Sequence, residues 1–298
     1  MIYKDLMEIA DKFDVFFFDA WGVFNIGGTI SKSAVAVMAD LQTRGKSVSI
    51  MSNTPQSAAG VTAHYGKSGL IPGVHYQNIF SSGQLCMDIA RRGEIPAPGK
   101  KYYVAWDYTC GLPGGGASYD MFAGTDYSKV ADISSADFVY LDFPRAASNL
   151  ITDEKLMEPE LSKVIAAGKP VICTNPDLHA CHGNEFVIMQ GTPARIFAAH
   201  GLKIIYYGKP HPEIYLDAMN KIGNVDAART LMVGDTLHTD ILGARRAGIK
   251  SCLTLADGIT ARDLTLAGRE LNRENINAAG AKIDAVPDYI IEKVADSH

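Results

Sequence analysis

Two aspartates that are far apart in the chain each follow an apolar run and precede a turn. Asp19 follows Phe16–Phe18, and Asp235 follows Leu231–Gly234. Such runs are typical of buried parallel strands, whose carboxyl ends meet at one edge of an open α/β sheet. Two carboxylates there repel each other unless a cation lies between them, and Mg²⁺ prefers oxygen ligands. The pair therefore indicates a magnesium site, although either aspartate alone also fits a turn or a helix cap.

Two further polar segments end predicted strands. Lys209 lies in Tyr207–Pro210, where an ammonium group can neutralise a phosphate and keep a carboxylate ionised. Ser52 and Asn53 end another strand and offer a hydroxyl and an amide to phosphate oxygens. A solvated loop lysine and an ordinary turn are the alternatives for these segments taken singly. Four such signals at strand ends favour one common site.

The order of these motifs resembles the haloacid dehalogenase superfamily, specifically its class IIA of NagD-like and 4-nitrophenylphosphatase-like phosphatases. The resemblance covers nearly the whole chain. The segments that carry it are Asp19 for the nucleophile motif, Gly22-Val23 for the class II form of that motif, Ser52-Asn53 for the second, Gly208-Lys209-Pro210 for the third, Gly234-Asp235 with Asp240 for the fourth, and Thr174–Asp177 for the cap loop.

The resemblance implies a Mg²⁺-dependent phosphohydrolase that forms an aspartyl-phosphate on Asp19. The metal would be held by Asp19, the backbone carbonyl of Trp21 and Asp235, with Asp240 behind them. Lys209 and Ser52 would stabilise the transferred oxygens. The expected substrate is a small phosphorylated metabolite: a sugar phosphate, a nucleoside monophosphate or pyridoxal phosphate. The residues expected to bind phosphate or substrate are Gly22, Asn53, Asn175, Pro176, Asp177, His179 and Thr236.

Trp21 departs from the family pattern, because the family normally has a second aspartate at this position. That aspartate protonates the leaving oxygen and then activates water, and indole does neither. A positioned acid or base contributes about 10²–10⁴-fold to the rate, so a slow or selective enzyme is expected. Three compensations are open: a good leaving group, a proton from the substrate, or a cap residue among Asp177, His179 and His182.

Two other readings compete with the phosphatase. A phospho-ligand-binding protein with weak or no turnover would explain Trp21, but the intact set of Asp19, Ser52, Lys209 and Asp235 argues against it. Carbon–halogen or carbon–phosphorus cleavage also dispenses with the second aspartate. The preserved metal acid argues against the first of these reactions, and no lysine suited to a Schiff base is identified for the second.

Alternating strand and helix patterns predict an α/β fold: a doubly wound parallel-sheet, Rossmann-like core with an inserted α/β cap. The predicted core comprises residues 1–90 and 185–298. The predicted cap comprises residues 91–184 and has a Pro/Gly-rich joint, Ile95–Gly99, near its start. The Gly114–Gly116 loop is expected at the cap edge, and one surface helix within Leu264–Ala279. A homodimer through the cap is kept as a candidate assembly.

The composition of the 298 residues, with 47% hydrophobic and 20% charged side chains, is that of a globular protein with a sizeable core. The net charge of −5 argues against a nucleic-acid-binding surface. Five scattered cysteines argue against a disulfide scaffold and favour a reducing, cytoplasmic setting. Neither a signal peptide nor an apolar run of about 20 residues is recognised, so no membrane association is expected.

Overall fold

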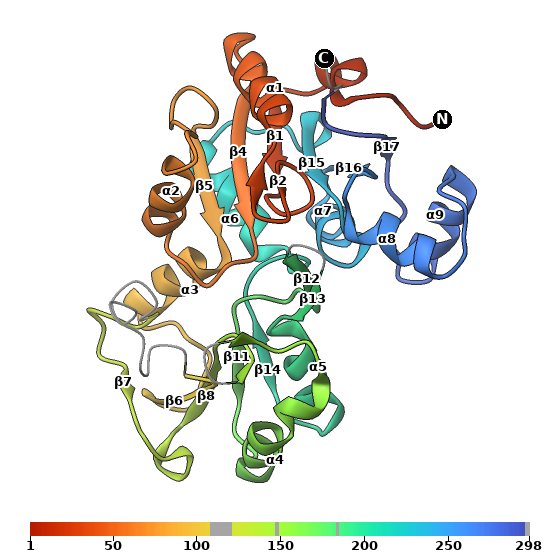
Figure 1. The fold of residues 1–298 in the computed structure, drawn as a ribbon. Coiled ribbons are helices and arrows are strands. Elements are labelled where there is room, and N and C mark those ends of the chain that lie inside the picture. Colours follow the sequence, from red (N-terminus) through yellow and green to blue (C-terminus); the bar gives the residue numbers. More distant parts are fainter. Residues whose placement is uncertain (108–120, 147–148, 183–184, 296–298) are drawn as a thin grey trace.

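The structure, a computed structural model, describes residues 1–107, 121–146, 149–182 and 185–295 and contains two parallel sheets, one above the other in Figure 1. The first has six strands in the order β17-β16-β15-β1-β4-β5, and the second has five in the order β14-β11-β8-β6-β7. The first sheet comprises β1 (Val15–Phe18), β4 (Ser47–Ser52), β5 (Asn78–Ser81), β15 (Thr230–Gly234), β16 (Lys250–Thr254) and β17 (Tyr289–Ile291). The second comprises β6 (Lys101–Ala105), β7 (Ser128–Lys129), β8 (Phe138–Leu141), β11 (Val171–Cys173) and β14 (Ile204–Tyr206).

Strand β1 lies between β15 and β4 in the first sheet, and all four of its side chains are buried. Phe18 is in register with Val233 of β15 and with Ile50 of β4. The backbone N–H of Asp19 continues this ladder by donating to the Val233 carbonyl at 2.9 Å. The register therefore brings the carboxyl ends of the three strands to the same edge, as the sequence predicts.

Three of the helices around the first sheet begin at side-chain caps. Ser31 accepts a hydrogen bond from the Ala34 N–H at the start of α1, and Ser57 and Ser81 cap their helices in the same way. Helices α1 and α2 pack on one face of the sheet, and α3, α6 and α7 pack on the other. These helices are α1 (Lys32–Thr43), α2 (Ala58–Gly66), α3 (Ser82–Arg91), α6 (Glu213–Ile222) and α7 (Leu242–Ala247).

The second sheet extends past the predicted boundary at residue 185, which is a correction. Strand β14 pairs in parallel with β11, and helix α5 (Gly191–Ala199) buries Ala194 and Phe197 in the same apolar cluster as α4 (Glu158–Ala167). The sequence predicts these elements as part of the core, because helix and strand patterns alternate through this region without a change in amino-acid composition. One apolar cluster also contains residues of both sheets, including Phe17, Tyr140 and Ile172, so the two sheets share buried surface.

The sequence does not predict the three short antiparallel hairpins, because strands of two to four residues show too little periodicity. The hairpin β12–β13 lies between the two sheets in Figure 1. The hairpins are β2 (Asn25–Ile26) with β3 (Thr29–Ile30), β9 (Arg145–Ala146) with β10 (Asn149–Leu150), and β12 (His179–His182) with β13 (Glu185–Ile188). Single 3₁₀ turns occur at Leu6–Glu8, Ala10–Lys12, Ile133–Ser135, Glu154–Met157 and Ala227–Arg229.

Two helices replace the single surface helix predicted within Leu264–Ala279, namely α8 (Ile259–Leu266) and α9 (Arg273–Ala281). The prediction is wrong because Gly268, with a φ of +68°, takes the left-handed conformation just after α8. The predicted Gly114–Gly116 loop lies outside the described residues. Across the described part of the chain, every helix is too short or too polar to cross a bilayer.

Candidate active site

A cavity of about 510 Å³ lies at the carboxyl ends of β1, β4 and β15, and residues from the parts of both sheets line it. Asp19, Ser52 and Asp235 come from the first sheet, and Asp177 and His179 come from the loop and hairpin that follow β11. The structure thus brings the predicted residues of both halves to one cavity. The predicted site residues in its lining are Asp19, Trp21, Gly22, Ser52, Asn53, Asn175, Pro176, Asp177, His179, Asp235 and Thr236.

Lys209 connects two of the aspartates beneath this cavity. Its Nζ lies 2.7 Å from Oδ1 of Asp19 and 2.6 Å from Oδ1 of Asp240, and its side chain is 1% exposed. Burial alone would lower the pKa of Lys209, but Asp19 and Asp240 raise it well above its ordinary value. The ammonium group therefore stays charged and holds the Asp19 carboxylate in place.

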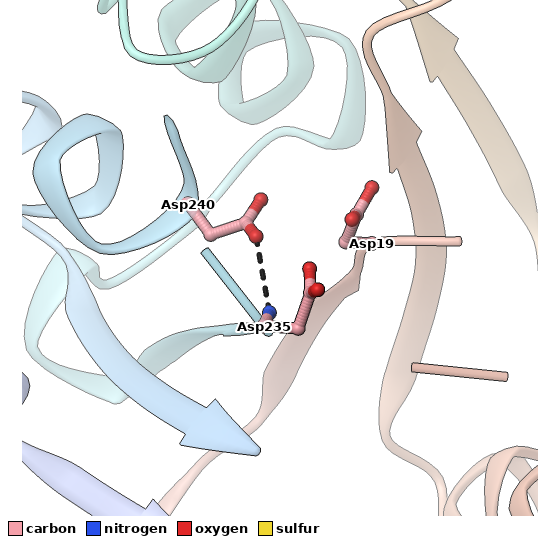
Figure 2. Close-up of side chains that lie close together, drawn as sticks. All are labelled: Asp19, Asp235 and Asp240. Atoms are coloured by element: carbon pink, nitrogen blue, oxygen red, sulfur yellow. Dashed lines mark hydrogen bonds between the residues drawn. The ribbon is translucent and has the colours of Figure 1, made fainter. Parts of the chain in front are cut away.

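Asp240 is fully engaged by the protein. Its Oδ1 accepts from Lys209, and its Oδ2 accepts from the backbone N–H groups of Asp235 and Thr236, each at 3.1 Å. Figure 2 shows the bond to Asp235. Asp240 lies in the π-helical turn Leu237–Ile241, just before α7, and is completely buried. It fits a role behind the metal ligands, as expected from the family resemblance.

Asp235 is held by donors on both carboxylate oxygens. Oδ2 accepts from the backbone N–H of Ile259 at 2.7 Å, and Oδ1 accepts from the hydroxyl of Thr236 at 3.0 Å. Thr236, predicted to bind phosphate, thus spends its hydroxyl on Asp235. Gly22 lies against the same carboxylate: its φ is +75°, and a Cβ on it would overlap Asp235. Gly22 therefore provides the space that Asp235 occupies.

The donor set fits Mg²⁺. Asp19, Asp235 and Asp240 each present a carboxylate oxygen within 4.8 Å of one another, and their side chains converge in Figure 2. Burial, as the largest cause, raises the pKa of Asp19 well above its ordinary value and that of Asp235 to about 7. A hard cation would relieve this penalty, and clustered carboxylates without sulfur or imidazole suit Mg²⁺. Asp240 accepts three hydrogen bonds, from Lys209 and from two backbone N–H groups. Each Asp235 oxygen accepts one, and Asp19 accepts one from Lys209, so Asp19 and Asp235 keep more lone pairs for a metal.

Asn53 positions Lys209. The Asn53 Nδ2 donates to the Lys209 carbonyl at 2.8 Å, and the Lys209 N–H donates back to Asn53 Oδ1 at 2.7 Å. A Cβ on Gly208, whose φ is +107°, would overlap the Asn53 amide, so glycine permits this close pairing. Ser52, the last residue of β4, is buried and lines the cavity beside it.

The cap loop after β11 is locked to both parts of the molecule. Asn175 Oδ1 accepts from the Asp177 N–H at 3.1 Å, and the Gly191 N–H donates to the Asp177 carbonyl at 3.0 Å. A Cβ on Gly191 would overlap the Pro176 carbonyl. On the core side, Ser82 donates to the Thr174 carbonyl. Asn175 and Pro176 thus shape the loop that presents Asp177 to the cavity.

The remaining predicted residues divide between cavity and surface. Trp21 lines the cavity and packs partly against the apolar cluster on the α1 side of the sheet. His179 lines the cavity with an exposed side chain. The side chain of His182 lies outside the described residues. The structure therefore places the residue at position 21, an indole, in the lining of the cavity.

Several lining residues carried no usable signal in the sequence. Tyr206 and His211 stack with ring centroids 4.8 Å apart and planes 10° from parallel. Arg145 and Arg195 line the cavity from the second-sheet side. The donor from Ile259 is a backbone group, which any residue type provides. Of these residues, only His211 could have been predicted to line the cavity, because it lies two residues after Lys209.

Models of the haloacid dehalogenase-like hydrolases match three stretches of the chain. One covers residues 89–248, which is more than half of the chain, and another covers residues 16–110. A third, described as HAD-hydrolase-like, covers residues 206–297. Together these matches include all four motifs.

Curated relatives and solved structures agree with this assignment. Human chronophin is 35% identical over 103 residues, which cover 35% of this chain and 31% of that protein. The ribonucleotide monophosphatase NagD of Escherichia coli K12 is 28% identical over 250 residues, covering 81% of this chain and 89% of that protein. The crystal structure of a haloacid dehalogenase-like hydrolase from Brucella suis 1330 superposes with a TM-score of 0.76 at 24% identity, covering 99% of this chain and 100% of that one. This last likeness shows the fold alone.

Proposed function

The chain belongs to the haloacid dehalogenase-like hydrolases, and we propose that it is a Mg²⁺-dependent phosphatase of small organic phosphates that works through an aspartyl-phosphate on Asp19. The observation that carries this proposal is the ion pair of Asp19 with Lys209, whose charged atoms lie 2.7 Å apart. Asp19 lines the cavity between the two sheets. A nucleophilic carboxylate needs a neighbouring cation, because the incoming phosphate is itself an anion.

In the first half of the reaction, the free Asp19 oxygen attacks phosphorus in line with the leaving oxygen. Lys209 neutralises the charge that Asp19 and the phosphoryl group bring together, and Ser52 donates to a transferred oxygen. Asn53 keeps the Lys209 backbone in place through its two reciprocal hydrogen bonds. In the second half, water attacks the phosphorus and releases Asp19.

Asp19 and Asp235, with the backbone carbonyl of Trp21, would hold the Mg²⁺, which polarises the phosphoryl oxygens when bound. Asp240 would orient this set by holding Lys209 with one oxygen and the strand end of β15 with the other. The Asp235 carboxylate is preoriented by Ile259 and Thr236. The oxygen ligands proposed for the metal are therefore held in place before it binds.

The substrate proposal rests on the cavity and on the relatives. A volume of about 510 Å³ is in the range of small-molecule sites. The name of the NagD relative supports a nucleoside monophosphate, and sugar phosphates and pyridoxal phosphate remain alternatives within the same reaction class. A phospho-ligand-binding protein is the second candidate, and Trp21 is the observation that favours it.

The test is phosphate release in Mg²⁺ from aryl phosphate, acetyl phosphate, sugar phosphates, nucleoside monophosphates and pyridoxal phosphate. Wild-type turnover that disappears in Asp19→Asn would support the covalent mechanism. Asp19→Asn at the wild-type rate would contradict it. A folded, Mg²⁺-binding protein without turnover on any substrate would favour the binding-protein alternative.

The cytoplasmic location, the absence of nucleic-acid and membrane partners and the homodimer through the cap stay predictions. Analytical ultracentrifugation of the full chain tests the last of these.

A further inference from the structure

We propose that Asp177, on the loop after β11, is the proton donor and acceptor that residue 21 does not provide. This inference rests on the proposed phosphatase function. Asp177 lines the same cavity as Asp19, yet it belongs to the other side of that cavity. It would therefore reach the reacting phosphate from the second-sheet side, whereas residue 21 lies beside the nucleophile on its own loop.

The position of Asp177 is set by the catalytic motifs themselves. Its Oδ1 accepts from Asn53 Nδ2 at 3.0 Å, and the same amide nitrogen donates to the Lys209 carbonyl at 2.8 Å. Lys209 in turn contacts Asp19 at 2.7 Å. Three hydrogen-bonded contacts thus connect the Asp177 carboxyl group with the nucleophile, and the Thr239 side chain is a further hydrogen-bond partner of the same carboxyl group.

The loop is also rigidly fixed on its own side. Asn175 and Gly191 hold the Asp177 backbone at 3.1 and 3.0 Å, and Thr192 donates to the Leu178 carbonyl at 2.7 Å. A proton donor has to be held near the leaving oxygen in a defined orientation. The described contacts fix the orientation of Asp177 from both sides of the cavity.

The other acids of the lining are less suitable. Asp19 and Asp235 belong to the nucleophile and the proposed metal site. Asp257 and Asp263 line the cavity but are solvent-exposed. Burial, opposed by Lys209 and Asn53, raises the pKa of Asp177 to about 6, which is suited to proton transfer near neutral pH.

The proposed step balances as follows. As the bond from Asp19 oxygen to phosphorus forms, the bond from phosphorus to the substrate oxygen breaks, and that oxygen takes the Asp177 proton to leave as an alcohol. The Asp177 carboxylate then takes a proton from water as the water oxygen attacks phosphorus. Inorganic phosphate leaves, Asp19 is regenerated, and Asp177 is protonated again.

The test compares Asp177→Asn with the wild type on an alkyl phosphate and on 4-nitrophenyl phosphate, whose leaving group needs no proton. Asparagine keeps an oxygen that accepts from Asn53 but cannot transfer the proton. The expected kcat/KM on the alkyl phosphate falls by about 10²–10⁴-fold, with little change on the aryl phosphate, because kcat/KM reports only the steps up to formation of the aspartyl-phosphate. Equal losses of kcat/KM on both substrates, or no loss on either, would overturn the proposal.

A rescue variant separates chemistry from positioning. Trp21→Asp in the Asp177→Asn background should restore alkyl phosphate turnover, because it returns the family acid. In the wild-type background, a large gain from Trp21→Asp would show that no acid was acting before and would overturn the proposal, whether or not Asp177→Asn folds. If the wild type hydrolyses the esters and Asp177→Asn does so at the same rate, only this inference is overturned. If the wild type is inactive on both esters, the proposed phosphatase function is overturned as well.

Discussion

The ammonium nitrogen of Lys209 lies 2.7 Å from Asp19 and 2.6 Å from Asp240, and the lysine is almost completely buried. Asp19 follows β1, Lys209 follows β14 of the second sheet, and Asp240 follows β15. Three strand ends from two sheets are therefore joined by one charged group. The same contact holds Asp19, the proposed nucleophile, at the edge of the cavity.

Removal of this lysine should damage both stability and turnover. Lys209→Met leaves Asp19 and Asp240 buried without their counter-charge, and breaking a buried pair costs about 3–5 kcal/mol. Chemical denaturation measures this loss. The matched control is Lys221→Met, because Lys221 makes solvent-exposed ion pairs with Asp88 and Asp217, which are worth at most about 1 kcal/mol. Similar losses for both variants would contradict the structural role given to Lys209.

Gly22 and Gly45 allow space and backbone strain to be separated. Their φ angles are +75° and +77°, but a Cβ on Gly22 would overlap Asp235, whereas a Cβ on Gly45 meets no atom of the described residues within 4 Å. Gly45→Ala should cost about 1–2 kcal/mol through its left-handed backbone alone. Gly22→Ala should cost more and should weaken Mg²⁺ binding, as measured by denaturation and isothermal titration calorimetry. Equal costs and unchanged Mg²⁺ binding would remove the close approach as the reason for glycine at position 22.

Metal removal should reveal the carboxylate site. Chelation is expected to abolish turnover, and Mg²⁺ at about 100 times its dissociation constant should stabilise the folded protein by about 2.7 kcal/mol. Asp235→Asn should lose most of this stabilisation, because one of two charged ligands is gone. The surface variant Asp284→Asn, which alters an exposed pair with Arg245, serves as the control. A full Mg²⁺ effect in Asp235→Asn, measured by thermal melting, would place the metal elsewhere.

The strand ends and their acids could be predicted because buried parallel strands leave a strong local signal. Val15–Phe18 and Leu231–Val233 are apolar throughout, so Asp19 and Asp235 stand out after them. The boundary of the cap was misplaced for the opposite reason: β14 resembles any core strand, and only its pairing with β11 assigns it to the second sheet.

The finer arrangement of the site was beyond the sequence. One donor to Asp235 is the backbone N–H of Ile259. Nearly every residue type has a backbone N–H, so the residue type at position 259 does not reveal this contact. Asn53 was predicted to bind phosphate, but its amide pairs with Lys209 and Asp177, partners 156 and 124 residues away. Such contacts depend on how the two sheets meet, which local patterns do not specify.

The pH dependence of turnover should expose the proton donor. Asp177 faces Lys209, Asp240 and Asp19, and burial is the largest cause that raises its pKa, to about 6. A raised carboxyl pKa means that the protonated form persists to higher pH than usual, and this form is the one that protonates the leaving oxygen. For an alkyl phosphate, kcat/KM should therefore fall as the pH rises through about 6. With 4-nitrophenyl phosphate, or in Asp177→Asn, this decline should be absent. A decline that persists unchanged in Asp177→Asn would assign the titration to another group.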